Sequence, residues 1–405
     1  MSPPLPPSSP RQTLDRNSPG WLILMGALTA LGPFSIDMYL PAFPAMADHL
    51  AVPRGDVERT LAAYLVGLAL AQIVYGPIAD RYGRKLPVIA GLVLYIVASL
   101  GCALASDVQT LSVWRVIQAL GGAAGVVIPR AVIRDHYDTQ DAARALSLLM
   151  LIMGLAPILA PLIGGQLLAF MGWRSLFWLM ALAAVALLIS VLGIMKESLS
   201  ADRVVPLRWN TIFGNYGALL RHRRFLAHSL SGGFGQAGMF TYIIGSPRVF
   251  IELYGVPAHY YGLLFGANAA ALIVGSQISA RLLRRLPPST LQRNAQRALA
   301  IVGLCGLALA LSGMMDLTVL MVCLLGYMFC QGFVNPNSAA LALAEQGHRL
   351  GAASALLGTL QFSCGAVAGL TISIWQTDSV LPLATVLAAC GCLSWAAGCV
   401  ARKQA

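Results

Sequence analysis

The sequence predicts an all-α membrane protein with twelve transmembrane helices in two six-helix halves, and two observations carry the prediction. Of 405 residues, 58% are hydrophobic and only 11% are charged, less than half the charged share of an ordinary soluble domain. Apolar stretches of about twenty residues recur along the whole chain, and each is long enough as a helix to cross a hydrocarbon core of roughly 30 Å. This pattern excludes a soluble enzyme, and we expect no enzymatic activity.

The first twenty residues are rich in Pro and Ser, and no small-residue cleavage site separates them from the first apolar run. We expect residues 1–20 to form a disordered cytoplasmic tail. The eight cysteines fall within the apolar runs or at their ends, without the spacing of metal ligands. They are expected to pack between helices, so we predict neither a metal site nor an organic cofactor.

Twelve apolar segments are expected to span the bilayer. They are residues 21–44, 57–77, 87–106, 109–130, 143–169, 174–195, 225–247, 259–280, 295–315, 317–343, 350–374 and 380–400. With this topology, 22 of the 27 Lys and Arg residues lie on the side of the N-terminus. The positive-inside rule then places both termini in the cytoplasm. It also explains the net charge of +11 without a nucleic-acid partner.

The longest connection, residues 196–224, separates an N-terminal bundle, residues 21–195, from a C-terminal bundle, residues 225–405. Apolar residues at helical spacing, flanked by arginines, predict a helix in this linker that lies on an anionic membrane surface. These residues are Trp209, Ile212, Phe213, Tyr216 and Leu220. The bundles echo each other: Arg81, Arg84 and Lys85 recur 200 positions later as Arg281, Arg284 and Arg285. Duplication of a six-helix unit explains this repeat, as does the positive-inside bias alone.

Two charged residues lie within the predicted spans, Asp37 in the first and Arg115 in the fourth. At about 1.5 Å per residue, both lie roughly 10 Å below the outer surface. Charged groups at membrane depth are costly and are kept mainly where they face a polar pathway. A buried carboxylate near a movable cation is suited to proton exchange, because burial opposes its charge and the cation favours it. We interpret both residues as proton-coupling and substrate-contact groups; a static ion pair is the alternative.

Uncharged polar and aromatic residues in the spans are further candidates for substrate contacts. Arg115, Gln118 and Gly122 share one helical face, and Pro33 and Pro41 bracket Asp37 in a segment where freed carbonyls and a bend are expected. Helix–helix contacts are the alternative role for most of the remaining candidates. The candidates are Tyr39, Tyr64, Gln118, Gln236, Tyr242, Asn268 and Gln361.

Two segments are candidates for conformational change. The loop from Gly76 to Lys85 holds one acid, Asp80, among three bases, Arg81, Arg84 and Lys85, with Gly83 permitting a tight reversal. Asp80 is expected to pair with a nearby arginine or with the positive N-terminal end of a helix, forming a cytoplasmic latch. In the fifth span, small residues and prolines form a stripe that permits close helix contact, either as a sliding seam or as static packing. They are Gly154, Pro157, Pro161, Gly164 and Gly165.

These segments together resemble the major facilitator superfamily, and within it the proton-coupled drug antiporters. The loop from Gly76 to Lys85 resembles the motif between helices two and three, and the segment from Leu111 to Ala124 resembles the helix-four motif. The stripe from Gly154 to Gly165 is similar to the antiporter motif of helix five, although Ala156 and Pro157 replace the usual Gly-Pro pair. Asp80 has no acidic counterpart in the second half, where Ala280 stands.

The segment from Pro33 to Pro41 and the Gly172-Trp173-Arg174 turn with Phe177 resemble the Bcr/CflA branch, the bicyclomycin and chloramphenicol exporters. The resemblance implies a monomer in the bacterial inner membrane that exports small amphipathic antibiotics in exchange for protons, with Asp37 protonatable and Arg115 involved in coupling. Symport, uniport or export of a metabolite such as a sugar or an amino acid is the alternative. It is disfavoured because both charges lie in the first half. A channel or receptor is weaker still, since no filter or signalling domain is present.

Overall fold

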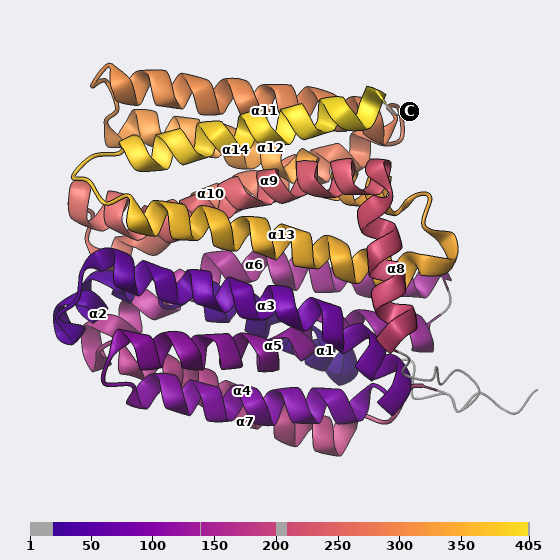
Figure 1. Ribbon diagram of the computed structural model, residues 1–405. Helices are drawn as coiled ribbons and strands as arrows, with labels where there is room; N and C mark the ends of the chain where they lie inside the picture. Colours follow the sequence, from indigo (N-terminus) through magenta and orange to yellow (C-terminus); the bar gives the residue numbers. More distant parts are fainter. Residues whose placement is uncertain (1–18, 138, 200–208, 404–405) are drawn as a thin grey trace, which may run out of the picture.

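The computed structural model describes residues 19–137, 139–199 and 209–403, and all regular secondary structure in these ranges is helical (Figure 1). Of the tail predicted for residues 1–20, residues 1–18 lie outside the described residues, while Pro19 and Gly20 begin α1. Twelve long helices are seen in the described part of the chain. They are α1 (Pro19–Asp37), α3 (Arg54–Tyr82), α4 (Lys85–Leu104), α5 (Val108–His136), α6 (Thr139–Met171), α7 (Arg174–Ile194), α9 (Arg223–Pro247), α10 (Ala258–Leu282), α11 (Pro288–Leu311), α12 (Leu317–Leu343), α13 (Leu350–Ile374) and α14 (Leu381–Lys403).

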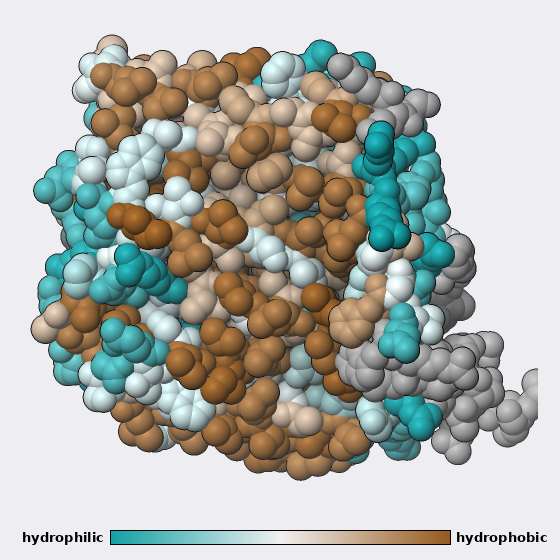
Figure 2. Space-filling view, in the orientation of Figure 1, coloured by the Kyte–Doolittle hydropathy of each residue, from teal (hydrophilic) through white to brown (hydrophobic). Residues whose placement is uncertain are grey.

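Eleven of the described helical segments are long and apolar enough to span a membrane by composition. The twelfth long helix, α9, is less hydrophobic than these eleven because Gly, Ser, Thr and Gln residues are spread through it. Its side chains are nearly all buried against other helices, so α9 needs little apolar surface. Elsewhere large apolar side chains face outward, and Figure 2 shows them as a broad belt between two hydrophilic ends. The predicted all-α membrane fold with twelve long helices is confirmed.

The first span is shorter than predicted. Helix α1 ends at Asp37, and the chain continues through the 3-10 turn η1 (Leu40–Ala42) into α2 (Phe43–Leu50). Pro41 explains the end of the helix, because a proline ring clashes with the carbonyl group four residues earlier, here that of Asp37. Asp37 is therefore the last residue of α1 rather than a residue inside a continuous span to 44.

The helices pack in the same pairs in both parts of the chain. We call α1–α7 the N half and α9–α14 the C half. In the N half α3 and α4 pack on α5, and α4 packs on α7; in the C half α10 and α11 pack on α12, and α11 packs on α14. Helices α3 and α10 end at Tyr82 and Leu282, 200 positions apart. The structural repeat therefore has the same offset as the repeated basic residues.

The halves meet along two seams, formed by α3 with α13 and by α6 with α10. Figure 1 shows α13 lying along α3. We call the end of the bundle with α8 (Trp209–Arg221) and the start of α1 the α8 end, and the opposite end, with α2, the α2 end (Figure 1). These names carry no assumption about the side of the membrane.

The predicted linker helix is present as α8, and residues 200–208 lie outside the described residues. Its apolar residues divide between two environments. Tyr216 and Leu219 are buried against the bundle, and the Tyr216 hydroxyl donates to the carbonyl oxygen of Ile73 in α3 at 3.0 Å. Phe213 and Leu220 are exposed. The prediction that Tyr216 faces the membrane is therefore wrong, because its polar hydroxyl finds a partner in the bundle.

Candidate functional site

Arg115 lies at the centre of the N half in a cage of aromatic rings. It is fully buried, and its guanidinium carbon is 4.3 Å from the ring centre of Tyr39 and 4.2 Å from that of Tyr64. The face of an aromatic ring attracts a cation, most strongly where water is excluded. The cage thus stabilises a full positive charge that has no ion-pair partner among the described residues.

Hydrogen bonds fix the orientation of the caged guanidinium. Arg115 donates to Oε1 of Gln118 at 2.6 Å and to the carbonyl oxygen of Ser35 in α1 at 2.8 Å. The Gln118 amide donates in turn to the hydroxyl of Ser99 at 2.8 Å. The side chains of Arg115 and Gln118 therefore lie on one face of α5, as their spacing predicted, and they join α5 to α1 and α4.

Asp37 lies at the interface of the halves. Its side chain is 3% exposed, and η1, which follows it, contacts both α9 and α10. The ionisable neighbours of its carboxyl group are the hydroxyls of Tyr242 and Tyr261 in the C half. Asp37 thus faces the C half. Among the described residues no ion pair joins Asp37 to Arg115, so the expected contact between the two charges is not made in this arrangement.

Asp37 comes together with two other predicted residues, Tyr242 of α9 and Asn268 of α10. Tyr242 stacks on Phe265 with ring centres 5.4 Å apart, and its hydroxyl adjoins the Asn268 side chain. Within the described part of the chain, Oδ1 of Asp37, Oη of Tyr242 and Oδ1 of Asn268 are buried without a geometrically acceptable hydrogen-bond partner. Buried polar atoms are normally satisfied, so a group of three marks a place for water or a polar ligand. We call these three residues the Asp37 site.

A chain of amides links three helices of the C half. Gln361 donates to Asn335 at 3.0 Å, and Asn335 donates to Gln236 at 3.0 Å. Gln236 and Gln361 were predicted as candidate contacts, and Asn335 between them is the residue that ties α9, α12 and α13 together. The three side chains are partly buried, and they offer neutral donors and acceptors at the inner side of the C half.

A cavity of about 970 Å³ lies between the halves at the α8 end. Its walls come from the second half of α3, from α5 and α6, from α8 and from the start of α13. Gly76, Asp80 and Arg84 line it, with Arg130 and Arg349 among the other charged residues. A volume of this size accommodates a drug-sized molecule. The α2 end, by contrast, is closed by contacts between the halves.

The predicted loop motif forms a charged clasp within the N half. Gly83 has φ +85°, which confirms the tight reversal. Arg84 donates to Oδ1 of Asp80 at 2.6 Å and to Oδ2 of Asp135 in α5 at 2.9 Å. Asp80 thus pairs with a nearby arginine, the first of its two expected partners. Arg81 is exposed. The clasp joins α3, α4 and α5, and the pairs that form it stay within one half.

A residue that sequence reasoning missed occupies the helix N-terminus expected for Asp80. Glu197, after α7, accepts hydrogen bonds from the backbone N–H groups of Arg84 at 2.8 Å and Lys85 at 3.1 Å. Burial alone would raise the pKa of Glu197, but these bonds and those from Ser198 and Leu199 hold it below its ordinary value. Lys85 also reaches the carbonyl oxygen of Leu192 in α7 at 3.3 Å. Only its distance in sequence hid this partner.

The predicted stripe in α6 faces α10 and η1. A methyl group on Gly164 would overlap the carbonyl oxygen of Met38, and one on Gly165 would lie 3.0 Å from that of Ala258. At Gly154 the nearest side chain is Ile273 of α10, 3.1 Å from such a methyl group. Pro157 and Pro161 lie on the same helix. The stripe is therefore a close-contact surface, as predicted: Gly154 and Gly165 meet α10 of the C half, and Gly164 meets Met38 within the N half. Its role in movement stays a prediction.

Comparisons with known proteins bear on the whole bundle. Residues 25–369 match the family model described as Major Facilitator Superfamily. The chain is 35% identical over 369 residues to an uncharacterized MFS-type transporter, YdgK, of Bacillus subtilis, covering 90% of both chains. It is 29% identical to a bicyclomycin resistance protein homolog of Haemophilus influenzae, covering 92% of this chain and 94% of that one. It is also 31% identical to the multidrug resistance protein MdtL of Shigella dysenteriae, covering 88% and 87%.

Solved structures show the same fold. A D-xylose-proton symporter superimposes with a TM-score of 0.74 at 15% identity, covering 95% of this chain and 97% of that one. A bacterial homolog of the human lysosomal transporter Spinster, described as inward-facing and occupied, superimposes with a TM-score of 0.70 at 14% identity, covering 95% and 96%. Identities this low show the fold alone.

Proposed function

Because the chain belongs to the major facilitator superfamily, we propose that this membrane transporter is a proton-coupled antiporter that exports small amphipathic antibiotics by alternating access. The protein is a transporter and not an enzyme. Relatives named for bicyclomycin resistance and multidrug resistance support drug export as its role, and they agree with the resemblance to the Bcr/CflA branch.

The observation that carries the proposal is the Asp37 site. A buried carboxyl group from the N half faces polar atoms of the C half that have no hydrogen-bond partner among the described residues. A drug and a proton that favour different states of one carboxyl group become linked, so that the movement of one drives the other. Ionised Asp37 would favour drug binding from one side, and its protonation from the other side would accompany drug release.

The proposed orientation places the α8 end in the cytoplasm of a bacterium, with the protein in its inner membrane as a monomer. The excess of Lys and Arg on that side supports this orientation. The cavity would then receive drugs from the cytoplasm, while the contacts at the α2 end keep the periplasmic side closed. Arg115, held in its cage, would keep α1 in place as Asp37 gains and loses its proton.

A second candidate function is transport of a polar metabolite such as a sugar. The amide chain of Gln236, Asn335 and Gln361 favours it, because neutral donors and acceptors suit the hydroxyl groups of such a substrate. The lack of charge in this chain agrees equally well with an uncharged drug. Substrate panels that include both classes separate the two candidates.

Drug-driven proton movement in proteoliposomes tests the proposal. We expect wild-type protein to move protons when bicyclomycin or chloramphenicol is added, and Asp37→Asn to abolish this movement. Asp378→Asn is the matched control, because the side chain of Asp378 is fully exposed. Proton movement that persists in Asp37→Asn would refute the role of Asp37. A response to sugars or amino acids but not to drugs would favour the second candidate.

A further inference from the structure

Glu58 is, with Asp37, one of two buried acidic residues in the described part of the chain, and the roles proposed above do not use it. It lies in the second turn of α3 at the α2 end, and its side chain is 2% exposed. Here α3 contacts the end of α13 so closely that a methyl group on Gly55 would overlap the carbonyl oxygen of Ser373. Glu58 is therefore buried by closure of the seam between the halves.

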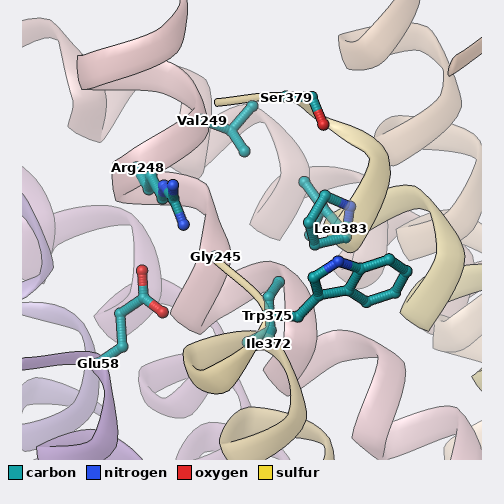
Figure 3. A pocket seen from close by; sticks show the side chains of 9 residues that line it. Glu58, Gly245, Arg248, Val249, Ile372, Trp375, Ser379 and Leu383 are labelled. Carbon is teal, nitrogen blue, oxygen red and sulfur yellow. The ribbon is translucent and has the colours of Figure 1, made fainter. Parts of the chain in front are cut away.

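A small pocket separates Glu58 from Arg248 of η3 (Arg248–Leu253). Figure 3 shows the Glu58 carboxyl group pointing toward Arg248 across this space, with Trp375 on another wall. Its volume is about 20 Å³, which is enough for one water molecule. Its lining is mostly apolar, and Glu58 and Arg248 are the charged groups that a single water there could bridge.

Each positive charge near Glu58 is engaged with another acceptor. Arg248 donates to the carbonyl oxygen of Thr377 at 2.8 Å and lies 3.7 Å from Asp378. Arg59, one residue along α3, is bonded to Asp56 at 2.7 Å.

The remaining charges at this end follow the same pattern. Arg54 is bonded to Asp48 at 2.8 Å and lies 3.3 Å from Glu252, which adds a negative charge near Glu58. Within the described residues, Oε2 of Glu58 is left without a partner. An ionised carboxylate in this position would be buried without the contacts that normally compensate for its charge.

The hydroxyl group of Ser373 lies beside the Glu58 carboxyl group. In this arrangement it donates to the carbonyl oxygen of Gly369 at 2.7 Å. A serine hydroxyl has one hydrogen to donate. With that hydrogen on Gly369, the hydroxyl offers Glu58 a lone pair, which a protonated carboxyl group can use and a carboxylate cannot.

We propose that Glu58 is a proton-binding site that controls closure of the α2 end: it takes up a proton when the halves close over it and releases the proton when they part. The proton bonds to the hydroxyl oxygen of Ser373. Since Glu58 lies at the α2 end, away from the cavity at the α8 end, its proton returns to the side from which it came. Glu58 thus senses acidity on that side without powering transport. The inference rests on the alternating access of the proposed function, but not on its drug or on Asp37.

Distance measurements across the α2 end test this site. Spin labels on Gln109 at the start of α5 and Thr318 at the start of α12, both exposed, report the separation of the halves there. The full chain in nanodiscs, with its native cysteines replaced and transport verified, is measured at a series of pH values. We expect acid to increase the closed population of wild-type protein, and Glu58→Gln to remain closed throughout with the pH response lost.

Two further variants make the result specific. Asp107→Asn at the same end should keep the wild-type response, because Asp107 is not among the charges around Glu58 and Asn caps α5 as Asp does. Ser373→Ala removes the acceptor for the protonated form, so closure should require a pH lower by roughly one unit. This variant also keeps the test available if Glu58→Gln does not fold.

The outcomes separate the inference from the proposed function. A pH response unchanged in Glu58→Gln, or unchanged in Ser373→Ala, would overturn the role of Glu58 even where drug-driven proton movement depends on Asp37. A response that disappears in Glu58→Gln would support the site even if wild-type protein moves no protons with drugs.

Discussion

The two halves share one scaffold but differ in the chemistry of their centres. The N half holds a caged cation, Arg115, whereas the C half holds neutral amides and hydroxyls. Its buried hydrogen bonds join Gln292 to Ser338, Asn337 to Ser279, and Gln361 to Asn335. Helix pairing is therefore independent of the polar groups at the centre. The charge in the N half suits the proton coupling proposed above, while the C half offers neutral contacts.

The largest expected effect follows from removing the caged cation. Arg115→Met should abolish transport and lower the free energy of unfolding by roughly 3 kcal/mol, because two cation–π contacts are lost and the Gln118 and Ser35 oxygens lose their donor. Initial transport rates and thermal unfolding in detergent measure both effects. Arg59→Met on the exposed face of α3 is the control. Full transport activity in Arg115→Met would show that the charge in the N half has no role that the neutral C half lacks.

A matched pair of arginines tests the same contrast at the α8 end. Arg84→Gln should cost roughly 2 kcal/mol, because Arg84 bonds two carboxylates while 9% exposed. Arg284→Gln, 200 positions later, should change the unfolding free energy by less than about 0.5 kcal/mol, because Arg284 is exposed. Thermal unfolding of the two variants compares them directly. Equal losses would show that the clasp contributes nothing particular to the N half.

The amide chain of the C half gives a smaller effect of a different kind. Asn335→Leu leaves Gln236 and Gln361 without their shared partner, so KM should rise about tenfold while proton movement per drug stays constant. Gln277→Leu on the exposed face of α10 serves as the control. Loss of coupling in Asn335→Leu would mean that the C half takes part in proton transfer.

The smallest effect concerns Glu197. The folded protein holds the pKa of Glu197 below its ordinary value. The carboxylate therefore stabilises the fold fully at pH values above the ordinary glutamate pKa, and this stabilisation is lost as the pH falls through the lowered pKa. Glu197→Gln should therefore lower Tm at neutral pH, and the difference from wild type should shrink on acidification. Thermal scans from neutral to acidic pH test this. A difference that grows in acid would contradict the assigned role of the carboxylate.

Several features could be predicted because they depend on local sequence. The number and approximate positions of the long helices follow from apolar runs, the reversal at Gly83 follows from its freedom of backbone conformation, and the Gly154–Gly165 stripe follows from residue size. The shared face of Arg115 and Gln118 follows from helical spacing. The clustering of Asp37, Tyr242 and Asn268 was not predicted as a cluster, although each residue was named for its polarity at membrane depth.

Other features escaped prediction for geometric reasons. Sequence gives the depth of Asp37 and Arg115 but not the direction in which each side chain points, so their separation could not be foreseen. Glu58 was passed over because it falls at the edge of the predicted second span, where a charged side chain can reach water. Only the contact with α13 buries it. Glu197 reaches Arg84 across 113 positions, a distance that no local pattern spans.

The repeated helix pairing has a consequence for biosynthesis. The helices of the N half find many partners within that half, and domains of a growing chain generally fold in order of synthesis. The first six long helices can therefore assemble in the bilayer before α9 leaves the ribosome. The linker with α8 then gives the translating ribosome an interval in which this first assembly is completed. A chain terminated within the linker should accumulate as an inserted, protease-resistant fragment.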